Sequence, residues 1–227
     1  MVHADDALSE APLFDALSPE DSQALRAKVL VVRLNRGERL FSEGDAGDKL
    51  YIILSGKIKL TKASVDGREN LQSVHGPGEM FGELSLFDPV PRTASATAIT
   101  DTELAGLAHD DVRAWLSSRP EVSMHLLQAL AQRLRRINEV KADLVFTDVP
   151  GRVAKALLDL EERFGVPTPD GIQVNHDLTQ EELAQLVGAS RETVNKALAD
   201  FAARGWIQLA AKSVLIVDND RLRKRAR

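Results

Sequence analysis

The run from Pro120 to Phe146 constrains the fold more than any other part of this sequence. It contains no glycine, and no proline after its first residue. Arg119-Pro120-Glu121 supplies a start signal with proline in the first turn. The run therefore predicts one uninterrupted helix, which at 1.5 Å per residue is about 40 Å long.

Apolar side chains recur along this run at steps of three and four, with a lysine at one place in the series. A repeat of about 3.5 residues is typical of a helix that pairs with a copy of itself, so the sequence predicts a homodimer. The alternative is a long amphipathic helix packed on the core of its own domain. The predicted dimer seam consists of Leu127, Leu130, Leu134, Ile137, Lys141 and Leu144.

Composition limits the class of protein. The 227 residues are enough for two domains, and 44% hydrophobic residues can supply a core for each. The chain has no cysteine, which excludes disulfides, thiolate metal sites, iron–sulfur clusters and cysteine nucleophiles. The first residues are acidic and lack the pattern of a signal peptide, and no apolar run is long enough to span a bilayer. We therefore expect a cytoplasmic protein without a membrane partner.

Short β-rich runs separated by glycines dominate the region before the long helix, after a short helix that Ser18-Pro19 begins. Such a pattern indicates an antiparallel roll, sandwich or barrel. The predicted strands are Val29–Leu34, Leu50–Leu54, Lys57–Thr61 and Leu71–His75, with a hairpin turn at Asp66-Gly67. A further strand pair is predicted at Ala94–Thr100 and Glu103–Leu107.

The region after the long helix has the pattern of a winged helix-turn-helix, in which a pair of helices is followed by a two-stranded wing. Three helices with capping residues are predicted, from Asp148 to Gly165, from Thr179 to Gly188 and from Ser190 to Gly205. The two predicted strands of the wing are Trp206–Leu209 and Ser213–Val217. The chain ends in basic residues, which we interpret as a solvated, disordered tail, with a basic face that touches DNA as the alternative. These residues are Arg221, Arg223, Lys224, Arg225 and Arg227.

The helix that starts after Ser190 has the composition of a DNA-reading helix. Its apolar residues fall on one face, and residue types that bind base edges fall on the opposite face near its N-terminus. The alternative is a solvated amphipathic face. The predicted base-reading residues are Arg191, Glu192, Asn195 and Lys196, and the other predicted DNA-binding residues are Thr179, Gln180, Ser190 and Thr193.

A second group of residues, from Phe81 to Thr93, has the composition of an anion site. Gly82 allows close approach of the backbone to a ligand, and Leu84-Ser85 can present N–H groups. Arg92 offers a charged fork for phosphate oxygens, with the Thr93 hydroxyl beside it. The alternative is a structural loop with a surface arginine.

Two longer segments resemble the Crp/Fnr family of bacterial transcription regulators. Leu178 to Val194, with Thr179-Gln180-Glu181-Glu182 and Ser190-Arg191-Glu192-Thr193, is similar to the family's DNA-reading segment. Phe81 to Thr93 is similar to its cyclic-nucleotide phosphate-binding cassette. The segments Asp66 to Asn70 and Phe146 to Arg152 are most similar to the cyclic-AMP receptor proteins and GlxR-like regulators of high-GC Gram-positive bacteria.

The resemblance implies an α+β fold with three parts. A jelly-roll-like antiparallel β-roll would occupy residues 1–118, a dimerisation helix and hinge 119–147, and a winged helix-turn-helix 148–227. It further implies that cyclic AMP is the effector and that the partners are an operator in double-stranded DNA, a second copy of the chain and RNA polymerase. By the same resemblance, ribose and cyclic phosphate are bound by Gly82, Glu83, Leu84, Ser85, Arg92 and Thr93, with Ser73 near the base.

The sequence departs from the family at two positions. The pair that contacts adenine across the dimer seam, usually two polar residues, is matched here by Ile137 and Asn138, so one hydroxyl is replaced by an apolar group. This leaves an alternative open, a regulator with another effector or one competent for DNA without any. Lys196 stands where the family commonly has arginine, which predicts looser discrimination at one base pair.

No other residues suggest chemistry. The five histidines have no metal-ligand spacing, so neither a metal nor a role is assigned to them. Trp115 and Trp206 are expected to anchor the cores. The sequence contains no paired carboxylates, nucleophile elbow or Walker loop, and we therefore expect a protein that is not an enzyme.

Overall fold

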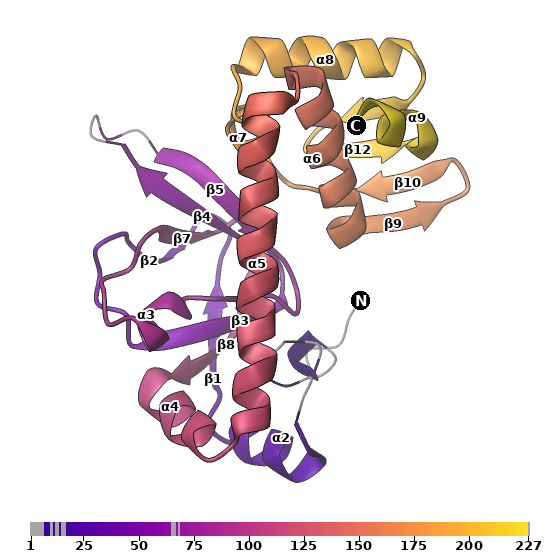
Figure 1. Cartoon of the computed structure of the whole chain (residues 1–227). Coiled ribbons are helices and arrows are strands. Elements are labelled where there is room, and N and C mark those ends of the chain that lie inside the picture. The colour runs from indigo at the N-terminus through magenta and orange to yellow at the C-terminus, as the bar shows by residue number, and fades with distance from the viewer. Residues whose placement is uncertain are drawn as a thin grey trace. The chain divides into compact units, whose positions relative to one another are not determined.

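The computed structural model of this chain describes residues 7–9, 11, 14, 17–64, 67 and 69–226, without the side chains of residues 121, 125 and 136. The fold is α+β, as predicted, and the chain divides into two compact units, residues 1–135 and 136–227 (Figure 1). Each unit has its own hydrophobic core. In the described part of the chain, no helix has the length and apolar character needed to cross a membrane.

The first unit contains two antiparallel four-stranded sheets, which confirms the predicted roll. The predicted strands at 29–34, 50–54, 57–61 and 71–75 all form, within one or two residues of the expected bounds at most ends. One sheet has the order β1 (Leu30–Leu34), β8 (Thr102–Ala108), β3 (Lys49–Ser55), β6 (Met80–Phe81), and the other β2 (Arg39–Phe41), β7 (Ser95–Ala98), β4 (Ile58–Ala63), β5 (Glu69–His75).

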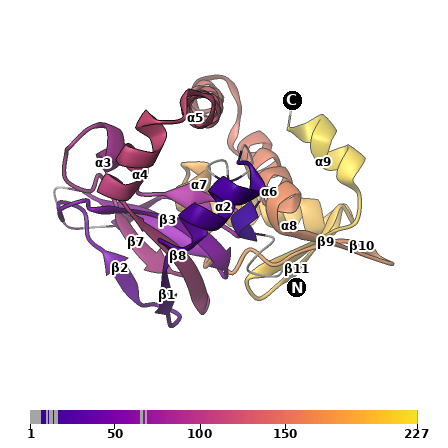
Figure 2. The same ribbon diagram turned by 90° about the horizontal axis from the view of Figure 1, so that it is seen from below.

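Strand β3 shows why this region is rich in apolar residues. Tyr51 and Ile53 point into the core between the two sheets, while Leu50, Ile52 and Leu54 pack on the opposite side. Because neighbouring residues of a strand face opposite ways, a strand covered on both sides is apolar throughout. Helices cover the outer side (Figure 2), namely α2 (Pro19–Arg26), α4 (His109–Ser117) and the first part of α5 (Pro120–Phe146).

The predicted pairing of the last two strands is wrong. Strands form at both places, but β7 pairs with β2 and β4, whereas β8 pairs with β1 and β3. The chain therefore passes from one sheet to the other between Ala98 and Thr102. Thr102 Oγ1 donates to the carbonyls of Lys57 and Thr100 at this crossing. Local sequence predicts strands, but lateral partners depend on how the two sheets bury their faces.

The predicted hairpin between β4 and β5 is confirmed. The two strands pair antiparallel from Ile58 opposite His75 to Ala63 opposite Glu69. Gly67 in the turn has φ +79°, a conformation that favours glycine. Asp66 and Arg68, on which the hairpin prediction and the family resemblance also depended, lie outside the described residues.

The second unit contains the predicted helices with their capping residues. Asp148 accepts from the Gly151 amide, Thr179 and Glu182 form a capping box, and Ser190 accepts from the Thr193 amide. The helices of this unit, after the end of α5, are α6 (Val149–Phe164), α7 (Gln180–Val187), α8 (Arg191–Ala203) and α9 (Asn219–Arg225).

The predicted two-stranded wing is half of a larger sheet. The observed order is β11 (Ile207–Ala210), β12 (Ser213–Ile216), β10 (Gly171–Val174), β9 (Gly165–Thr168). The sequence does not predict the hairpin of β9 and β10, because Gly165, Pro167 and Gly171 suggest chain breaks. Pro167 is tolerated because β9 is an edge strand that pairs only with β10 within the described sheet.

The prediction of a disordered tail is also wrong. Asn219–Arg225 forms α9, in which Asp218 caps the N-terminus and Leu222 is completely buried in the core of the second unit. Arg225 donates to Asp148, the capping residue of α6, at 2.5 Å. Although α9 is mostly basic, its one apolar side is sufficient to pack the helix against the core of the second unit. Arg227 lies outside the described residues.

Helix α5 confirms the longest predicted element, with bounds that match the run from Pro120 to Phe146. Val122 and Leu126 are buried in the core of the first unit. Most of the predicted seam is not covered by the chain itself, since Leu134 is 60% exposed and Leu144 50%. The two tryptophans pack as expected: Trp115 is buried in the first unit, and Trp206 stacks on Phe201 in the second.

Candidate functional site

The residues of the predicted cassette come together at the end of β6. Phe81 is the last residue of that strand, and the next residue, Gly82, has φ +80°. A Cβ at Gly82 would lie 2.7 Å from Arg92 Nη1, so both the backbone conformation and the space require glycine. The short helix α3 (Leu84–Phe87) follows, and the loop after it carries Arg92.

Arg92 is a buried cation, with 4% of its surface exposed. Nη1 donates to the Gly82 carbonyl at 3.0 Å and Nη2 to the Lys49 carbonyl at 2.7 Å. The guanidinium lies over the ring of Phe41, 4.3 Å from its centroid. Burial lowers the pKa of Arg92 from its ordinary value, but an arginine remains charged at physiological pH.

This cation lacks a matching anion. Its Nε is buried and has no hydrogen-bond partner, and no carboxylate in the described part of the chain lies within ion-pair distance of Arg92. A buried charge is stable only when it is paired, and the two carbonyls supply dipoles rather than a full negative charge. The arrangement suits an anionic ligand such as a phosphate.

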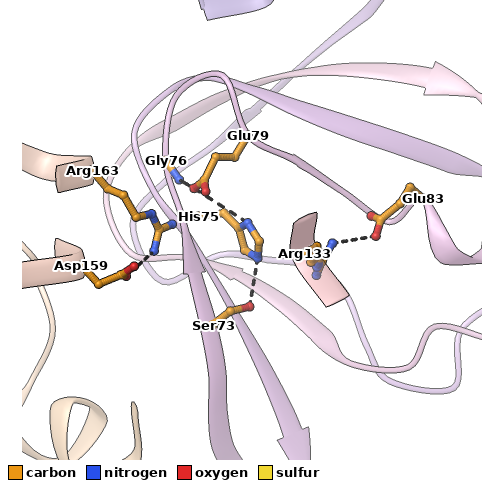
Figure 3. A network of polar contacts seen from close by, with 8 residues as sticks. All are labelled: Ser73, His75, Gly76, Glu79, Glu83, Arg133, Asp159 and Arg163. Carbon is orange, nitrogen blue, oxygen red and sulfur yellow. Dashed lines mark hydrogen bonds and ion pairs between the residues drawn. The ribbon is translucent and has the colours of Figure 1, made fainter. Parts of the chain in front are cut away.

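Glu83 is the buried acid of the cassette, only 1% exposed. Its Oε1 accepts from Arg133 Nη1 at 2.6 Å, and Arg133 belongs to α5 (Figure 3). A carboxylate has about four lone-pair sites, so Glu83 can accept from a ligand hydroxyl as well. Arg133 is not among the ligand residues predicted from sequence, although its spacing from Val122 and Leu126 places it on the buried side of α5.

The remaining predicted ligand residues differ in exposure. Ser85 is buried. A Cβ at Gly47 would lie 2.3 Å from the Oγ of Ser85, so the loop that contains Gly47 packs closely on α3. Ser73, on β5, is bonded through Oγ to His75 Nε2 at 2.9 Å (Figure 3). Leu84 and Thr93 are exposed. Ile137 and Asn138 lie further along α5, in the second unit, and both are exposed.

His109, to which the sequence analysis assigns no role, contacts the cassette. Its Nε2 lies 3.3 Å from the Gly82 carbonyl, the same oxygen that Arg92 binds. Burial is the main reason why the pKa of His109 lies below its ordinary value, and the charges of Arg92 and Arg113 act in the same direction. The Asp48 carboxylate and the bond to Gly82 oppose this shift. Only the folded positions of β6 and α4 could reveal this contact.

The predicted DNA-reading residues lie at the start of α8. Val194, Leu198 and Phe201 are buried in the core of the second unit, so the opposite face is turned outward. Arg191, Glu192, Thr193 and Lys196 are exposed, while Asn195 is half-buried. The Lys196 ammonium lies 2.7 Å from the Glu192 carboxylate, an exposed pair that a base contact can replace at little cost.

Thr179 and Gln180 lie at the start of α7. Thr179 Oγ1 accepts from the Glu182 amide at 3.1 Å, so this hydroxyl serves the capping box. Gln180 Oε1 accepts from Arg191 Nη2 at 3.3 Å and from Asn195 Nδ2 at 3.2 Å. Among the described residues, no group of three or more His, Asp or Glu side chains could hold a metal ion.

Comparison with known families identifies both units. Residues 31–119 match the cyclic nucleotide-binding domain, and residues 151–225 match the Crp-like helix-turn-helix domain. The chain is 56% identical to the CRP-like cAMP-activated global transcriptional regulator of Mycobacterium tuberculosis, over 98% of this chain and the whole length of that protein. The chain belongs to the Crp/Fnr family. It is also 38% identical to the cyclic AMP receptor protein of Thermus thermophilus, over 90% of this chain and 91% of that protein.

Solved structures of Crp/Fnr proteins have the same fold. The catabolite activator protein of Thermus thermophilus superimposes with a TM-score of 0.54 at 35% identity, over 95% of this chain and 98% of that chain. The c-di-GMP responsive regulator CLP of Xanthomonas campestris superimposes with a TM-score of 0.73 at 26% identity, over 88% of this chain and 99% of that chain. Members of the Crp/Fnr family are transcription regulators and not enzymes, so the two units are a cyclic-nucleotide-binding unit and a DNA-binding unit.

Proposed function

We propose that this Crp/Fnr regulator is a homodimer, controlled by cyclic AMP, that reads a near-palindromic operator. For the effector, the observation that carries the proposal is Arg92, a buried cation in the cassette whose Nε has no hydrogen-bond partner and which has no carboxylate partner among the described residues. The relative in Mycobacterium tuberculosis, 56% identical, is named as cAMP-activated. We assign the β-roll to residues 1–118, the dimer helix and hinge to 119–147 and the winged helix to 148–227.

In the effector site, Arg92 binds the cyclic phosphate and Glu83 accepts from the ribose. Gly82 allows the backbone to approach the ligand closely. The negative charge of the phosphate balances the positive charge of the buried Arg92. The other proposed contacts with ribose and phosphate are Leu84, Ser85 and Thr93, and those with the base are Ser73, Ile137 and Asn138.

Dimerisation through α5 is supported by its uncovered apolar side chains. Leu127, Leu134 and Ile137 are 56%, 60% and 46% exposed in one chain. A continuous apolar stripe of this kind in a soluble regulator indicates an interaction surface. The heptad spacing of the stripe fits a second copy of the same helix better than an unrelated partner.

Two-fold symmetry then explains the expected operator. The α8 helices of the two copies would enter successive major grooves, about 34 Å apart, so each half-site is read in the same way. Arg191 and Glu192 read base edges, while Ser190 and Thr193 bind phosphates. We extend the contact with RNA polymerase and the cytoplasmic location to this chain because its relatives are named as transcriptional regulators.

Calorimetric titration with cyclic AMP and cyclic GMP, followed by binding to a selected operator, tests the proposal. We expect saturable binding of cyclic AMP, weaker binding of cyclic GMP, and operator affinity that rises when cyclic AMP is present. A ligand that binds the DNA-competent state about tenfold more tightly contributes about 1.4 kcal/mol to this switch. No binding of cyclic AMP, or the same operator affinity without it, would overturn cyclic AMP as the effector.

The alternative function is a regulator with another effector, or one that binds DNA without any. It is favoured by Ile137, which replaces the usual hydroxyl residue, and by the Xanthomonas campestris neighbour, which is named as c-di-GMP responsive. The titration above separates the two functions, and the variant Ile137→Thr tests whether the missing hydroxyl matters for cyclic AMP. Tighter binding of cyclic AMP would indicate that the lost hydroxyl contacts adenine, and unchanged affinity would leave Ile137 as a seam residue alone.

A further inference from the structure

Gln180, the first residue of α7, connects the two helices of the helix-turn-helix through a single oxygen. Its Oε1 accepts from Arg191 Nη2 and from Asn195 Nδ2, at 3.3 and 3.2 Å. Arg191 and Asn195 are four residues apart and therefore lie on adjacent turns of one face of α8. One amide group thus holds two of the predicted DNA-reading side chains.

Asn195 is an unfavourable residue at its position. It is half-buried, and its Oδ1 is enclosed without a hydrogen-bond donor in the described part of the chain. A buried acceptor without a donor destabilises the folded state. Positions that violate such a rule are often functional, and here the other end of the amide, Nδ2, donates to Gln180 Oε1.

These contacts leave Asn195 unable to read a base in its present conformation. A bidentate contact with adenine needs both the donor and the acceptor of the amide. In Asn195 the acceptor is enclosed, and one of the two Nδ2 N–H donors is bound to Gln180, so the donor–acceptor pair is not free for adenine. The structure therefore favours a positioning role over the base-reading role predicted from sequence.

Arg191, by contrast, keeps the donors that reading requires. A guanidinium has five N–H donors, and Gln180 accepts from Nη2 alone. The other donors can form the bidentate contact with guanine O6 and N7. An exposed arginine loses conformational freedom when it binds, and a contact that already holds it reduces this loss.

We infer that Gln180 and Asn195 are positioning residues that hold Arg191 in its base-reading conformation and so set sequence specificity without contacting a base. Asn195 orients the amide of Gln180, and Gln180 orients the guanidinium. The inference rests on the proposed function, because it requires that Arg191 reads DNA.

The test measures fluorescence anisotropy of labelled duplexes with saturating cyclic AMP. The duplexes are an operator selected from random sequence by the wild-type protein, the same operator with each base pair replaced in turn, and an unrelated sequence. Gln180→Met keeps the side-chain length but removes the acceptor, and Gln180→Glu keeps the acceptor. Gln23→Met, on the exposed side of α2, is the matched control. Thermal unfolding is measured for every variant.

We expect Gln180→Met to lower operator affinity about tenfold, which corresponds to about 1.4 kcal/mol, and to weaken the preference at the base pair that Arg191→Ala affects. Binding to the unrelated duplex should not change. In the Arg191→Ala background, Gln180→Met should have no further effect, and Gln180→Glu should retain the base preference. Asn195→Leu should raise the unfolding temperature yet weaken the same preference.

Three results would overturn the inference alone. Gln180→Met could weaken binding to all duplexes by the same factor, the unrelated one included, which would make Gln180 a phosphate contact. It could leave base preference unchanged, or Asn195→Leu could abolish preference at a different base pair, which would make Asn195 a reader. If the wild-type protein bound no DNA even at low salt, the proposed function would be overturned together with the inference.

Discussion

At the scale of single residues, the effector site is defined by groups that are stable only with a partner. Arg92 is buried with two carbonyl acceptors and without a carboxylate partner in the part of the chain that the structure describes, whereas Glu83, also buried, is paired with Arg133. The site therefore has one satisfied anion and one incompletely satisfied cation. This asymmetry predicts a ligand that brings negative charge to Arg92 and a hydroxyl donor to Glu83.

Arg92→Leu should abolish cyclic-nucleotide binding while the fold remains intact. Charge-assisted hydrogen bonds contribute about 1.5–3 kcal/mol each, so the loss of two predicts an affinity at least about 100-fold lower. Isothermal calorimetry measures the affinity, and thermal unfolding confirms the fold. Unchanged affinity in a folded variant would contradict the assignment of the cyclic phosphate to Arg92.

His109 should make the stability of the first unit depend on pH. Its pKa in the folded protein lies below the ordinary value of 6.5, so as the pH falls through 6.5 the unfolded chain binds a proton before the folded one does. The free energy of unfolding should therefore fall as the pH is lowered from about 6.5 and be unaffected by this group above that pH.

The variant His109→Gln tests this assignment, since glutamine can still donate to the Gly82 carbonyl but does not titrate. Denaturant unfolding at several pH values between about 5 and 8 should show a smaller dependence on pH in the variant than in the wild type. Equal slopes in both proteins would mean that other groups cause the pH dependence.

At the scale of elements, α5 has three different structural roles along its length. Its first part packs Val122 and Leu126 into the core, its middle brings Arg133 to Glu83, and its apolar stripe remains exposed. The core side and the ligand contact follow one side of the helix, and the stripe follows another. A single helix can therefore connect an occupied effector site to the surface that we propose as the dimer seam.

Leu134→Asp should convert the proposed dimer to a monomer at micromolar concentration. Leu134 is 60% exposed in one chain, so the change should not unfold the subunit, but it would place two carboxylates in the seam. Sedimentation velocity measures the association state. Gln132→Asp, an exposed change on the same helix outside the seam, is the control and should remain dimeric. A dimeric Leu134→Asp variant would contradict the proposed seam.

At the scale of the whole molecule, regulation requires that one small ligand alters the affinity of a pair of DNA-binding units. In the proposed dimer, each operator half-site meets one α8, so affinity depends on both copies binding at once. The structural requirement is that the two reading helices stand one DNA turn apart when the effector is bound. Any departure from that spacing should affect the operator complex far more than binding of the effector.

Insertion of about five base pairs between the half-sites of the operator tests this requirement, because it rotates one half-site by about half a turn. Affinity should fall toward the non-specific level, about 10³-fold or more below the specific one. Insertion of a full turn, about ten base pairs, tests whether rotation or distance causes the loss. Operator affinity that does not depend on spacing would mean that each unit binds alone.

The sequence alone determined the elements whose signals are local. Caps at Asp148, Thr179 and Ser190, the length of α5 and most strands of the roll followed from spacing, because a capping bond or a heptad involves neighbours within a few residues. The resemblance to the Crp/Fnr family supplied the assignments of the cassette and of the reading helix, because each is a continuous segment that can be compared with the family residue by residue.

Only the tertiary structure decided which distant residues meet. The separation of β7 and β8 into two sheets, the docking of α9 through Leu222, and the contacts of Arg133 and His109 with the cassette all join segments far apart in the chain. The same holds for the amide of Gln180 between Arg191 and Asn195. Such contacts depend on burial and packing of whole faces, which no local pattern encodes.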